Sequence, residues 1–110
     1  TPTGSTGYSL SCGGPVIDPS TESFVITPIA PHNLNARPLV IPDSTIVKLR
    51  VHTRSKSFLT SLDSRTVALP NGATIEIKKA PYKISLVQLT ENSFFNTLRK
   101  KLLWGEDKRN

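Results

Sequence analysis

The chain has 110 residues, a formal net charge of +6 and a single cysteine. This length suits one domain with its own core and is too short for two substantial domains. No disulfide can form within the chain, and no apolar run approaches the roughly 20 residues that a membrane-spanning helix needs. With no signal-peptide pattern, these features predict a soluble protein of a reducing, cytoplasmic compartment.

The first thirty residues predict a short helix followed by a strand. Residues 5 to 12 form the expected helix, with Ser5 as its N-cap and the Gly13-Gly14 pair as its end. Residues 24 to 29 are aromatic and β-branched but interrupted by a proline. They therefore predict an edge-like or bulged strand.

The middle of the chain predicts closely spaced β-strands. Residues 46 to 52 alternate apolar and polar side chains after the first residue, and residues 74 to 78 do the same, as expected for strands with one solvent-facing side. Turn residues separate the β-rich runs. The expected strands are Leu39–Ile41, Thr45–His52, Phe58–Leu62, Thr66–Leu69, Thr74–Lys79 and Ile84–Leu89. Because no helix intervenes, we expect a mainly β fold, an antiparallel sandwich-like or distorted-barrel domain with a helix near each end.

The last segment predicts an amphipathic helix. It begins at Asn92 or Ser93 as the N-cap, and its apolar residues recur at helical spacing. Gly105 is expected to end it. The apolar positions are Phe95, Leu98 and Leu102, and the opposite face carries Arg99, Lys100 and Lys101. We expect the apolar face to cover the β-domain.

The positive charge does not predict a nucleic-acid partner. Apart from residues 99 to 101 and the pair Lys108 and Arg109, which we expect in a frayed tail, the basic residues are scattered. Cations near a helix C-terminus are favoured by the helix dipole, and aromatic residues are too few for a platform that stacks on single strands. A positive field would equally suit a protein with polyphosphate ligands. We expect neither a nucleic acid nor a membrane as partner.

The opening segment, residues 1 to 14, surrounds glycines with hydroxyl side chains at the start of a helix. Glycine lets the backbone approach a ligand, helix N-terminal amides accept anionic oxygens, and the Tyr8 ring can cover a base or a ribose. This combination suits a nucleotide, although such loops are more often simple turns. It matches neither the phosphate loop that ends in Gly-Lys-Ser/Thr nor the glycine fingerprint of dinucleotide folds.

Four blocks of the sequence resemble the NAD kinase family. Residues 1 to 15, TPTGSTGYSLSCGGP, are similar to that family's TPTGSTAYSLSAGGP. Residues 27 to 40, TPIAPHNLNARPLV, resemble its TPI-x-PH-x-L-x-x-RP-L-V block. Residues 61 to 65, SLDSR, resemble its Asp-Ser-Gln or Asp-Gly-Gln turn, and residues 94 to 104 resemble the bacterial ending FFNTLRxKLxW. Together the blocks reach from the first residue nearly to the last.

The resemblance implies phosphorylation of the adenosine-ribose 2′-hydroxyl of NAD by ATP, which gives NADP, with Mg²⁺ assisting. Gly7 stands where the family has alanine, which removes a methyl group and no hydrogen-bond donor. Arg65 stands where the family has glutamine, so that a cation able to meet a phosphate replaces a neutral group. The dinucleotide contacts implied for this chain are Thr6, Gly7, Tyr8, Ser9, Leu10, Ser11 and Arg65.

The resemblance also implies that the catalytic groups lie elsewhere. Attack of a hydroxyl on a γ-phosphate needs a placed carboxylate and groups that neutralise the phosphates. In the family an N-terminal α/β domain supplies them through a Gly-Gly-Asp-Gly loop and an Asn-Glu motif. We therefore expect residues 1 to 110 to be the C-terminal domain of a bacterial-type NAD kinase, without catalytic or metal-binding residues. It would be inactive alone, joined to that missing domain, and part of a homo-oligomer.

Two other functions stay open. A lipid kinase of the diacylglycerol or sphingosine type shares the two-domain plan, although the TPTGSTGYS opening and the Pro31-His32 block correspond to the dinucleotide-specific version. Alternatively, a non-catalytic β-domain could bind RNA through its basic surface with a steep salt dependence.

The remaining polar candidates have structural explanations. His32 lies in a proline-rich turn that its ring is expected to hold by hydrogen bonds. Asp63 and Ser64 predict a hairpin turn that also shapes the site. Cys12 has no evident base nearby and is expected to be a packed thiol.

Overall fold

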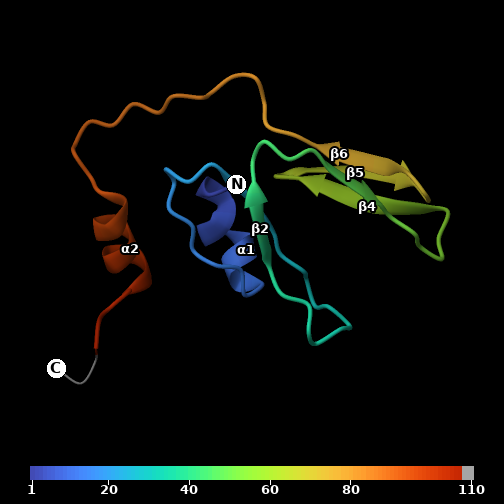
Figure 1. Cartoon of the computed structure of the whole chain (residues 1–110), viewed down its shortest axis with the longest axis horizontal. Helices are drawn as coiled ribbons and strands as arrows, with labels where there is room; N and C mark the ends of the chain where they lie inside the picture. Colours follow the sequence, from blue (N-terminus) through green and yellow to red (C-terminus); the bar gives the residue numbers. More distant parts are fainter. Residues whose placement is uncertain (108–110) are drawn as a thin grey trace. The chain divides into compact units, whose positions relative to one another are not determined.

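The computed structural model describes residues 1 to 107 (Figure 1). Lys108 and Arg109, for which we expected a frayed tail, lie outside the described residues. In chain order, the elements are the 3-10 helix η1 (Thr3–Thr6), α1 (Tyr8–Ser11), β1 (Ser23–Ile26), β2 (Leu39–Pro42), β3 (Val47–Arg50), β4 (Ser57–Leu62), β5 (Arg65–Pro70), β6 (Thr74–Ile77) and α2 (Phe94–Leu102). The expected mainly β class, with a short N-terminal helix and a C-terminal helix, is confirmed.

The strands pair into three antiparallel sheets of two strands each, β1 with β2, β3 with β6, and β4 with β5. Within residues 1 to 107 they do not close into a barrel. The β4–β5 hairpin turns at Asp63 and Ser64, where Leu62 pairs with Arg65. Asp63 has a φ of 53°, in the left-handed region that Asp tolerates better than most residues. The expected hairpin turn is therefore confirmed.

Contacts divide the chain into two compact units. One unit holds residues 1 to 42 and the part from residue 81 onward, and the other holds residues 43 to 80. In the second unit, the turn after β5 contacts the loop that follows β3. Asn71 accepts a hydrogen bond on its side-chain oxygen from the Thr53 backbone (3.0 Å), and Gly72 donates one to the Val51 carbonyl (3.0 Å). These bonds join the β3–β6 pair to the β4–β5 hairpin.

The single helix expected over residues 5 to 12 is wrong in its details, because η1 and α1 are separate. Gly7 lies between them with φ −91° and ψ −132°, a non-helical conformation. Ser5 is not an N-cap. It lies inside η1, fully buried, and its hydroxyl donates to the Pro2 carbonyl (2.7 Å) and accepts from the Ile17 amide (3.1 Å). The two partners explain why this hydroxyl is buried rather than placed at a helix end.

The C-terminal helix, α2, begins as expected and ends earlier than expected. Ser93 is its N-cap, and the Ser93 hydroxyl accepts from the Asn96 amide (3.2 Å). The expected stop at Gly105 is wrong, because Leu103 already adopts a left-handed conformation with φ 53°. None of the helices within residues 1 to 107 is both long and apolar enough to span a membrane.

The strand expected at Ile84–Leu89 does not form. Residues 83 to 88 have no regular secondary structure, and the side chains of Leu86 and Leu89 are 85% and 94% exposed. A strand needs a partner for its backbone hydrogen bonds, and no other segment of residues 1 to 107 pairs with this one. The apolar pattern is present, but no partner strand for it lies in the described chain.

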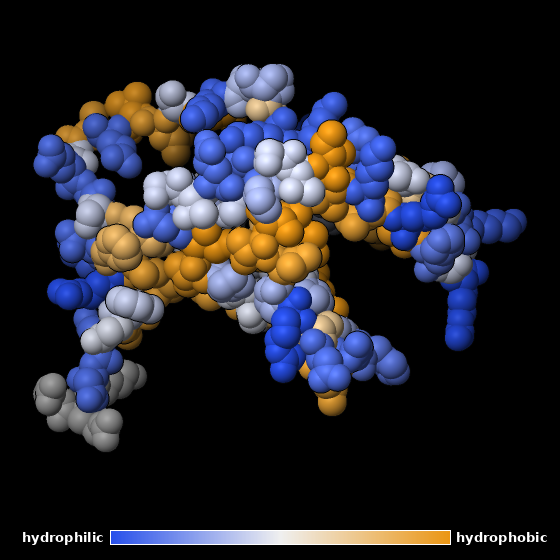
Figure 2. All heavy atoms as spheres, in the orientation of Figure 1, coloured by the Kyte–Doolittle hydropathy of each residue, from blue (hydrophilic) through white to orange (hydrophobic). Residues whose placement is uncertain are grey.

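The buried apolar core within residues 1 to 107 is small. Ile17 and Leu98, both in the first unit, are the apolar residues that are buried there. Many large apolar side chains are uncovered, and apolar atoms are open to view on the face drawn in Figure 2. Exposed apolar surface of this extent is typical of sites where a protein contacts another protein surface.

Candidate functional site

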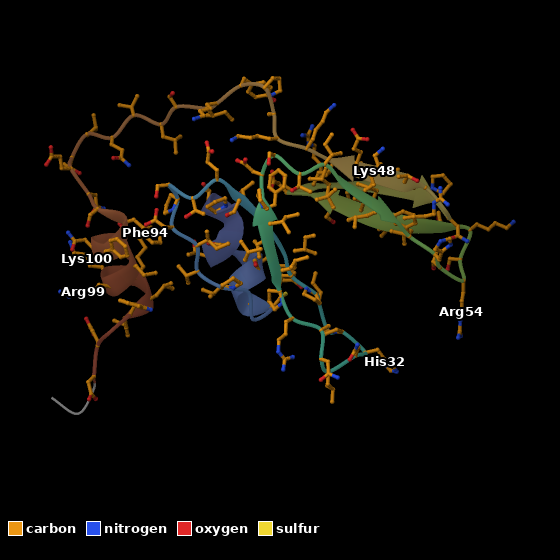
Figure 3. The ribbon with its side chains drawn as sticks, in the orientation of Figure 1. His32, Lys48, Arg54, Phe94, Arg99 and Lys100 are labelled. Atoms are coloured by element: carbon orange, nitrogen blue, oxygen red, sulfur yellow. The ribbon has the colours of Figure 1, made fainter. Side chains whose placement is uncertain are left out.

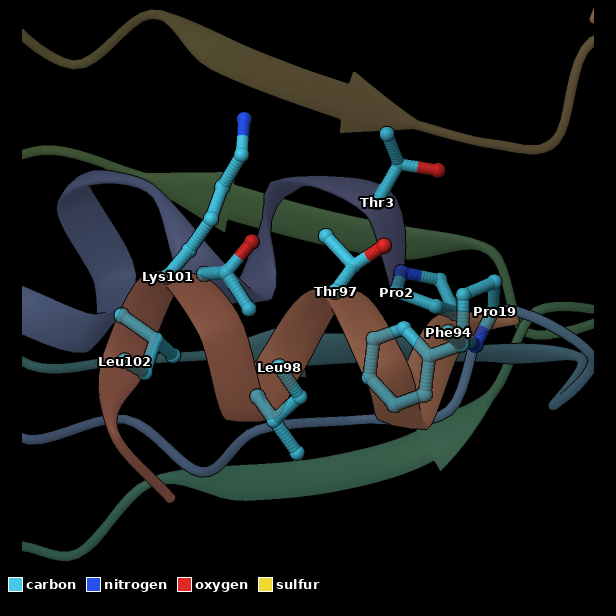
Figure 4. Close-up of a pocket in the computed structure, with 9 residues that line it drawn as sticks. Pro2, Thr3, Pro19, Phe94, Thr97, Leu98, Lys101 and Leu102 are labelled. Carbon is cyan, nitrogen blue, oxygen red and sulfur yellow. The ribbon is translucent and has the colours of Figure 1, made fainter. Parts of the chain in front are cut away.

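The segment for which dinucleotide contacts are expected runs through η1 and α1 and borders two cavities. The first, called here the Tyr8 cavity, has a volume of about 220 Å³. The second, called the α2 cavity, has a volume of about 300 Å³ (Figure 4). The walls of the Tyr8 cavity include Thr1, Gly4, Tyr8, Ser9, Val25 and Thr27, and those of the α2 cavity include Pro2, Thr6, Pro19, Phe94, Leu98 and Lys101.

Of the seven expected contact residues, Thr6, Tyr8 and Ser9 line these two cavities, whereas Gly7, Leu10, Ser11 and Arg65 line neither. Tyr8 and Ser9 share a wall of the Tyr8 cavity, whereas Thr6 lines the α2 cavity. The Tyr8 side chain is 69% exposed. An exposed tyrosine on a cavity wall offers a flat apolar ring with a polar tip, which suits a ligand that is part aromatic and part polar.

Gly7 is held by backbone hydrogen bonds to neighbouring residues. Its amide donates to the Gly4 carbonyl (3.0 Å), and its carbonyl accepts from the Leu10 amide (3.1 Å). A Cβ atom at this position would lie 3.3 Å from the Gly4 carbonyl oxygen. The alanine of the related motif therefore requires the Gly4 carbonyl to shift by a few tenths of an ångström.

Ser9 is the residue of α1 most firmly tied to the surrounding chain. Its hydroxyl is hydrogen-bonded to the Thr27 hydroxyl at 2.7 Å, across 18 positions of sequence. Its carbonyl accepts from the amides of Cys12 (3.1 Å) and Gly14 (2.8 Å). The hydroxyl bond connects α1 to Thr27, the first residue after β1, and the carbonyl bonds connect it to the turn that follows α1.

The position of Gly14 leaves no space for a side chain. A Cβ atom there would overlap the Ser9 hydroxyl and lie 2.9 Å from the Thr27 hydroxyl. Sequence reasoning treated Gly14 as part of a helix stop and left Thr27 without a role. The only signal in the sequence is that both residues belong to the two blocks that resemble the same family.

Arg65 lies in the other unit of the chain. It is the first residue of β5, directly after the hairpin turn, and its side chain is exposed. An exposed guanidinium keeps its donors available for an anionic ligand.

The expectation that His32 holds its turn by hydrogen bonds is wrong. Within the described residues its ring makes no hydrogen bond, and Figure 3 shows it pointing away from the loop. The turn is held by its neighbours instead. The Asn33 side chain accepts from the Asn35 amide (2.9 Å), and the Arg37 guanidinium donates to the Leu34 carbonyl (2.7 Å). An amide and a guanidinium close this turn better than a ring, because both reach backbone groups two or three residues away.

The acidic residues contribute turns rather than a metal site. The Asp18 carboxylate accepts from the Ser20 hydroxyl (2.6 Å) and the Ser20 amide (2.8 Å), and these hydrogen bonds hold the pKa of that carboxyl below its usual value. Cys12 is a free, half-buried thiol. In residues 1 to 107 no three His, Cys, Asp or Glu side chains are grouped so that they could hold a metal ion.

Comparison with known proteins shows similarity along the whole chain. The family model of the ATP-NAD kinase C-terminal domain matches residues 1 to 89. The NAD kinase of Christiangramia forsetii is 70% identical over 110 residues, and that of Flavobacterium psychrophilum is 61% identical over 110 residues. Each match covers 100% of this chain and 37% of the relative. The chain thus spans little more than a third of the length of these curated relatives.

A solved structure has a similar fold. The crystal structure of yeast NADH kinase complexed with NADH matches with a TM-score of 0.69 and 25% sequence identity. The match covers 97% of this chain and 34% of the yeast chain. The arrangement of strands and helices described above is therefore also found in a longer kinase.

Proposed function

Because the chain belongs to the family of ATP-NAD kinase C-terminal domains, we propose that it is the dinucleotide-binding domain of an NAD kinase. The protein that contains it transfers the γ-phosphoryl group of ATP to the adenosine-ribose 2′-hydroxyl of NAD. The hydroxyl proton is released, and the products are ADP and NADP. The observation that carries the proposal is the family match over residues 1 to 89, a range that includes every residue lining the Tyr8 cavity.

We assign this chain to binding and not to chemistry. Its described residues offer no grouped carboxylates or imidazoles that fit a metal ion, although phosphoryl transfer relies on Mg²⁺ and a placed base. The relatives are much longer than this chain. We propose that the base and the metal site lie in the part of the protein for which this chain has no counterpart, the expected N-terminal domain.

The exposed apolar surface supports the proposed partners. Leu86, Val87 and Leu89 are 85% to 94% exposed in the segment that precedes α2. Apolar surface of this kind is covered in a working protein. We propose that the N-terminal domain and further copies of this chain cover this apolar surface. We also propose that the two units belong to one sandwich-like domain, and that the assembled homo-oligomer acts in the cytoplasm.

The Tyr8 ring is expected to contribute directly to NAD binding. In the full-length protein, Tyr8→Ala should raise the KM for NAD about tenfold, because stacking of a base on an aromatic ring contributes roughly 1–3 kcal/mol. The KM for ATP should stay within about twofold. NADP formation is measured with a coupled dehydrogenase assay.

The matched control for this variant is Tyr82→Ala, since Tyr82 is exposed to a similar extent, 71% against 69% for Tyr8. Equal NAD kinetics in the two variants would remove Tyr8 from the binding site. A full-length wild-type protein that phosphorylates a lipid emulsion, or binds RNA with steep salt dependence, and makes no NADP would overturn the proposed function itself.

Arg65 is expected to strengthen binding through its charge. Arg65→Gln, which introduces the residue usual in the family, should weaken NAD binding about threefold at low salt, and the loss should shrink at 0.5 M salt because surface charges are screened. Isothermal titration of the full-length protein with NAD measures both values. Arg54→Gln, a change of another exposed arginine of the same unit (Figure 3), is the control. A loss of the same size at low salt and at 0.5 M salt, or no loss relative to Arg54→Gln, would show that the Arg65 cation meets no phosphate.

A further inference from the structure

One side-chain hydrogen bond ties the proposed binding helix to the β-structure. The Ser9 and Thr27 hydroxyls lie 2.7 Å apart in a partly buried position. Thr27 directly follows β1, which is paired with β2 over four residues. A partly buried hydroxyl pair that joins a one-turn helix to a paired strand holds an element that is too short to be stable alone.

The bond also limits what Ser9 can do. The Ser9 hydroxyl is engaged with Thr27, and its carbonyl accepts from the Cys12 and Gly14 amides. Ser9 and Thr27 line the same cavity as the exposed ring of Tyr8. Tyr8 directly precedes Ser9 in the chain. The hydrogen bonds that hold Ser9 in place therefore also limit the direction in which the Tyr8 side chain leaves α1.

We propose that Thr27 is a positioning residue for NAD, which acts through Ser9 and sets the place of the Tyr8 ring. The proposal rests on the proposed function. It assigns Ser9 the same positioning role, in place of the direct dinucleotide contact implied by the family resemblance. The block of residues 27 to 40 then has a defined role, because its first residue, Thr27, holds the helix α1 of the block of residues 1 to 15.

The test uses the full-length protein and the near-isosteric change Thr27→Val. Loss of one such hydrogen bond should raise the KM for NAD about fivefold. Because the chemical groups are untouched, kcat and the KM for ATP should stay within about twofold. Thr27→Ser keeps the hydroxyl and should restore the KM for NAD to within about twofold of the wild type. Thr74→Val, at an exposed strand threonine of the other unit, is the matched control.

A double-mutant cycle separates positioning from direct contact. If Ser9 acts only through Thr27, the effects of Ser9→Ala and Thr27→Val on the KM for NAD should not add, and the double variant should match the single ones. Additive effects would show that Ser9 contacts NAD independently and would overturn its positioning role. If Thr27→Val does not yield folded protein, Ser9→Ala alone decides, and an unchanged KM for NAD overturns the inference.

The outcome of this experiment is distinguishable from failure of the proposed function. If the wild-type protein makes no NADP, the proposed function is wrong and the variants report nothing about NAD binding. If the wild type makes NADP and Thr27→Val behaves like Thr74→Val, the function stands and Thr27 has no positioning role.

Discussion

Gly14→Ala is expected to be the most damaging single change in the binding segment, with a loss of tenfold or more in kcat/KM for NAD. The added methyl group would overlap the Ser9 hydroxyl and lie 2.8 Å from the Ser9 carbonyl oxygen and 2.9 Å from the Thr27 hydroxyl. A carbonyl oxygen cannot rotate away, so α1 and the strand end must separate. Overpacking of this kind costs about 1–3 kcal/mol.

The measurements for Gly14→Ala are NAD kinetics and thermal unfolding of the full-length protein. Gly4→Ala is the control for unfolding, because a Cβ there would lie an ordinary 3.6 Å from the Thr1 hydroxyl oxygen. The melting temperature should fall by several degrees for Gly14→Ala and stay nearly unchanged for Gly4→Ala. Equal NAD kinetics in Gly14→Ala and the wild type would show that the contact of α1 with the strand end has no bearing on binding.

The fold was predictable from the sequence where local signals decide it. Alternating residues in β3 and β6, the hairpin turn at Asp63 and the cap at Ser93 follow from side-chain period and turn or cap chemistry. Ile84–Leu89 has the same apolar signal and forms no strand. The difference lies in the partner: pairing is a non-local property, and the pattern of one segment does not say whether another segment is present to receive it.

The candidate site was predictable only as a segment, and its internal organisation was not. The composition of residues 1 to 14 suggests a ligand site. The bond between Ser9 and Thr27, however, spans 18 positions, and no periodic pattern in the sequence indicates it. Ser5 shows the same limit, since a serine at the start of a helical run reads as an N-cap and here bonds to Ile17 instead. Hydroxyl groups have several possible partners, and the tertiary structure selects among them.

Leu98→Ala is expected to cause the largest loss of stability among changes in α2. Leu98 is 6% exposed and lines the α2 cavity with Phe94 and with Pro2 and Pro19 from the opening part of the chain (Figure 4). Truncating a buried leucine costs about 2–5 kcal/mol, and the cost is highest where the surroundings cannot collapse into the space. A site that already borders a cavity of about 300 Å³ has few atoms available to refill it.

The test of this prediction compares Leu98→Ala with Lys100→Ala in the full-length protein by urea unfolding. Lys100 is an exposed residue of the same helix, so its truncation should change the free energy of unfolding by less than about 0.5 kcal/mol. Equal losses in the two variants would show that α2 is not held through Leu98. Because Thr6 lines the same cavity as Leu98, Leu98→Ala should also raise the KM for NAD, although α2 lies beyond the residues that the family model matches. On this prediction α2 supports the opening segment through the α2 cavity, Thr27 supports it through the hydrogen bond to Ser9, and binding depends on both supports.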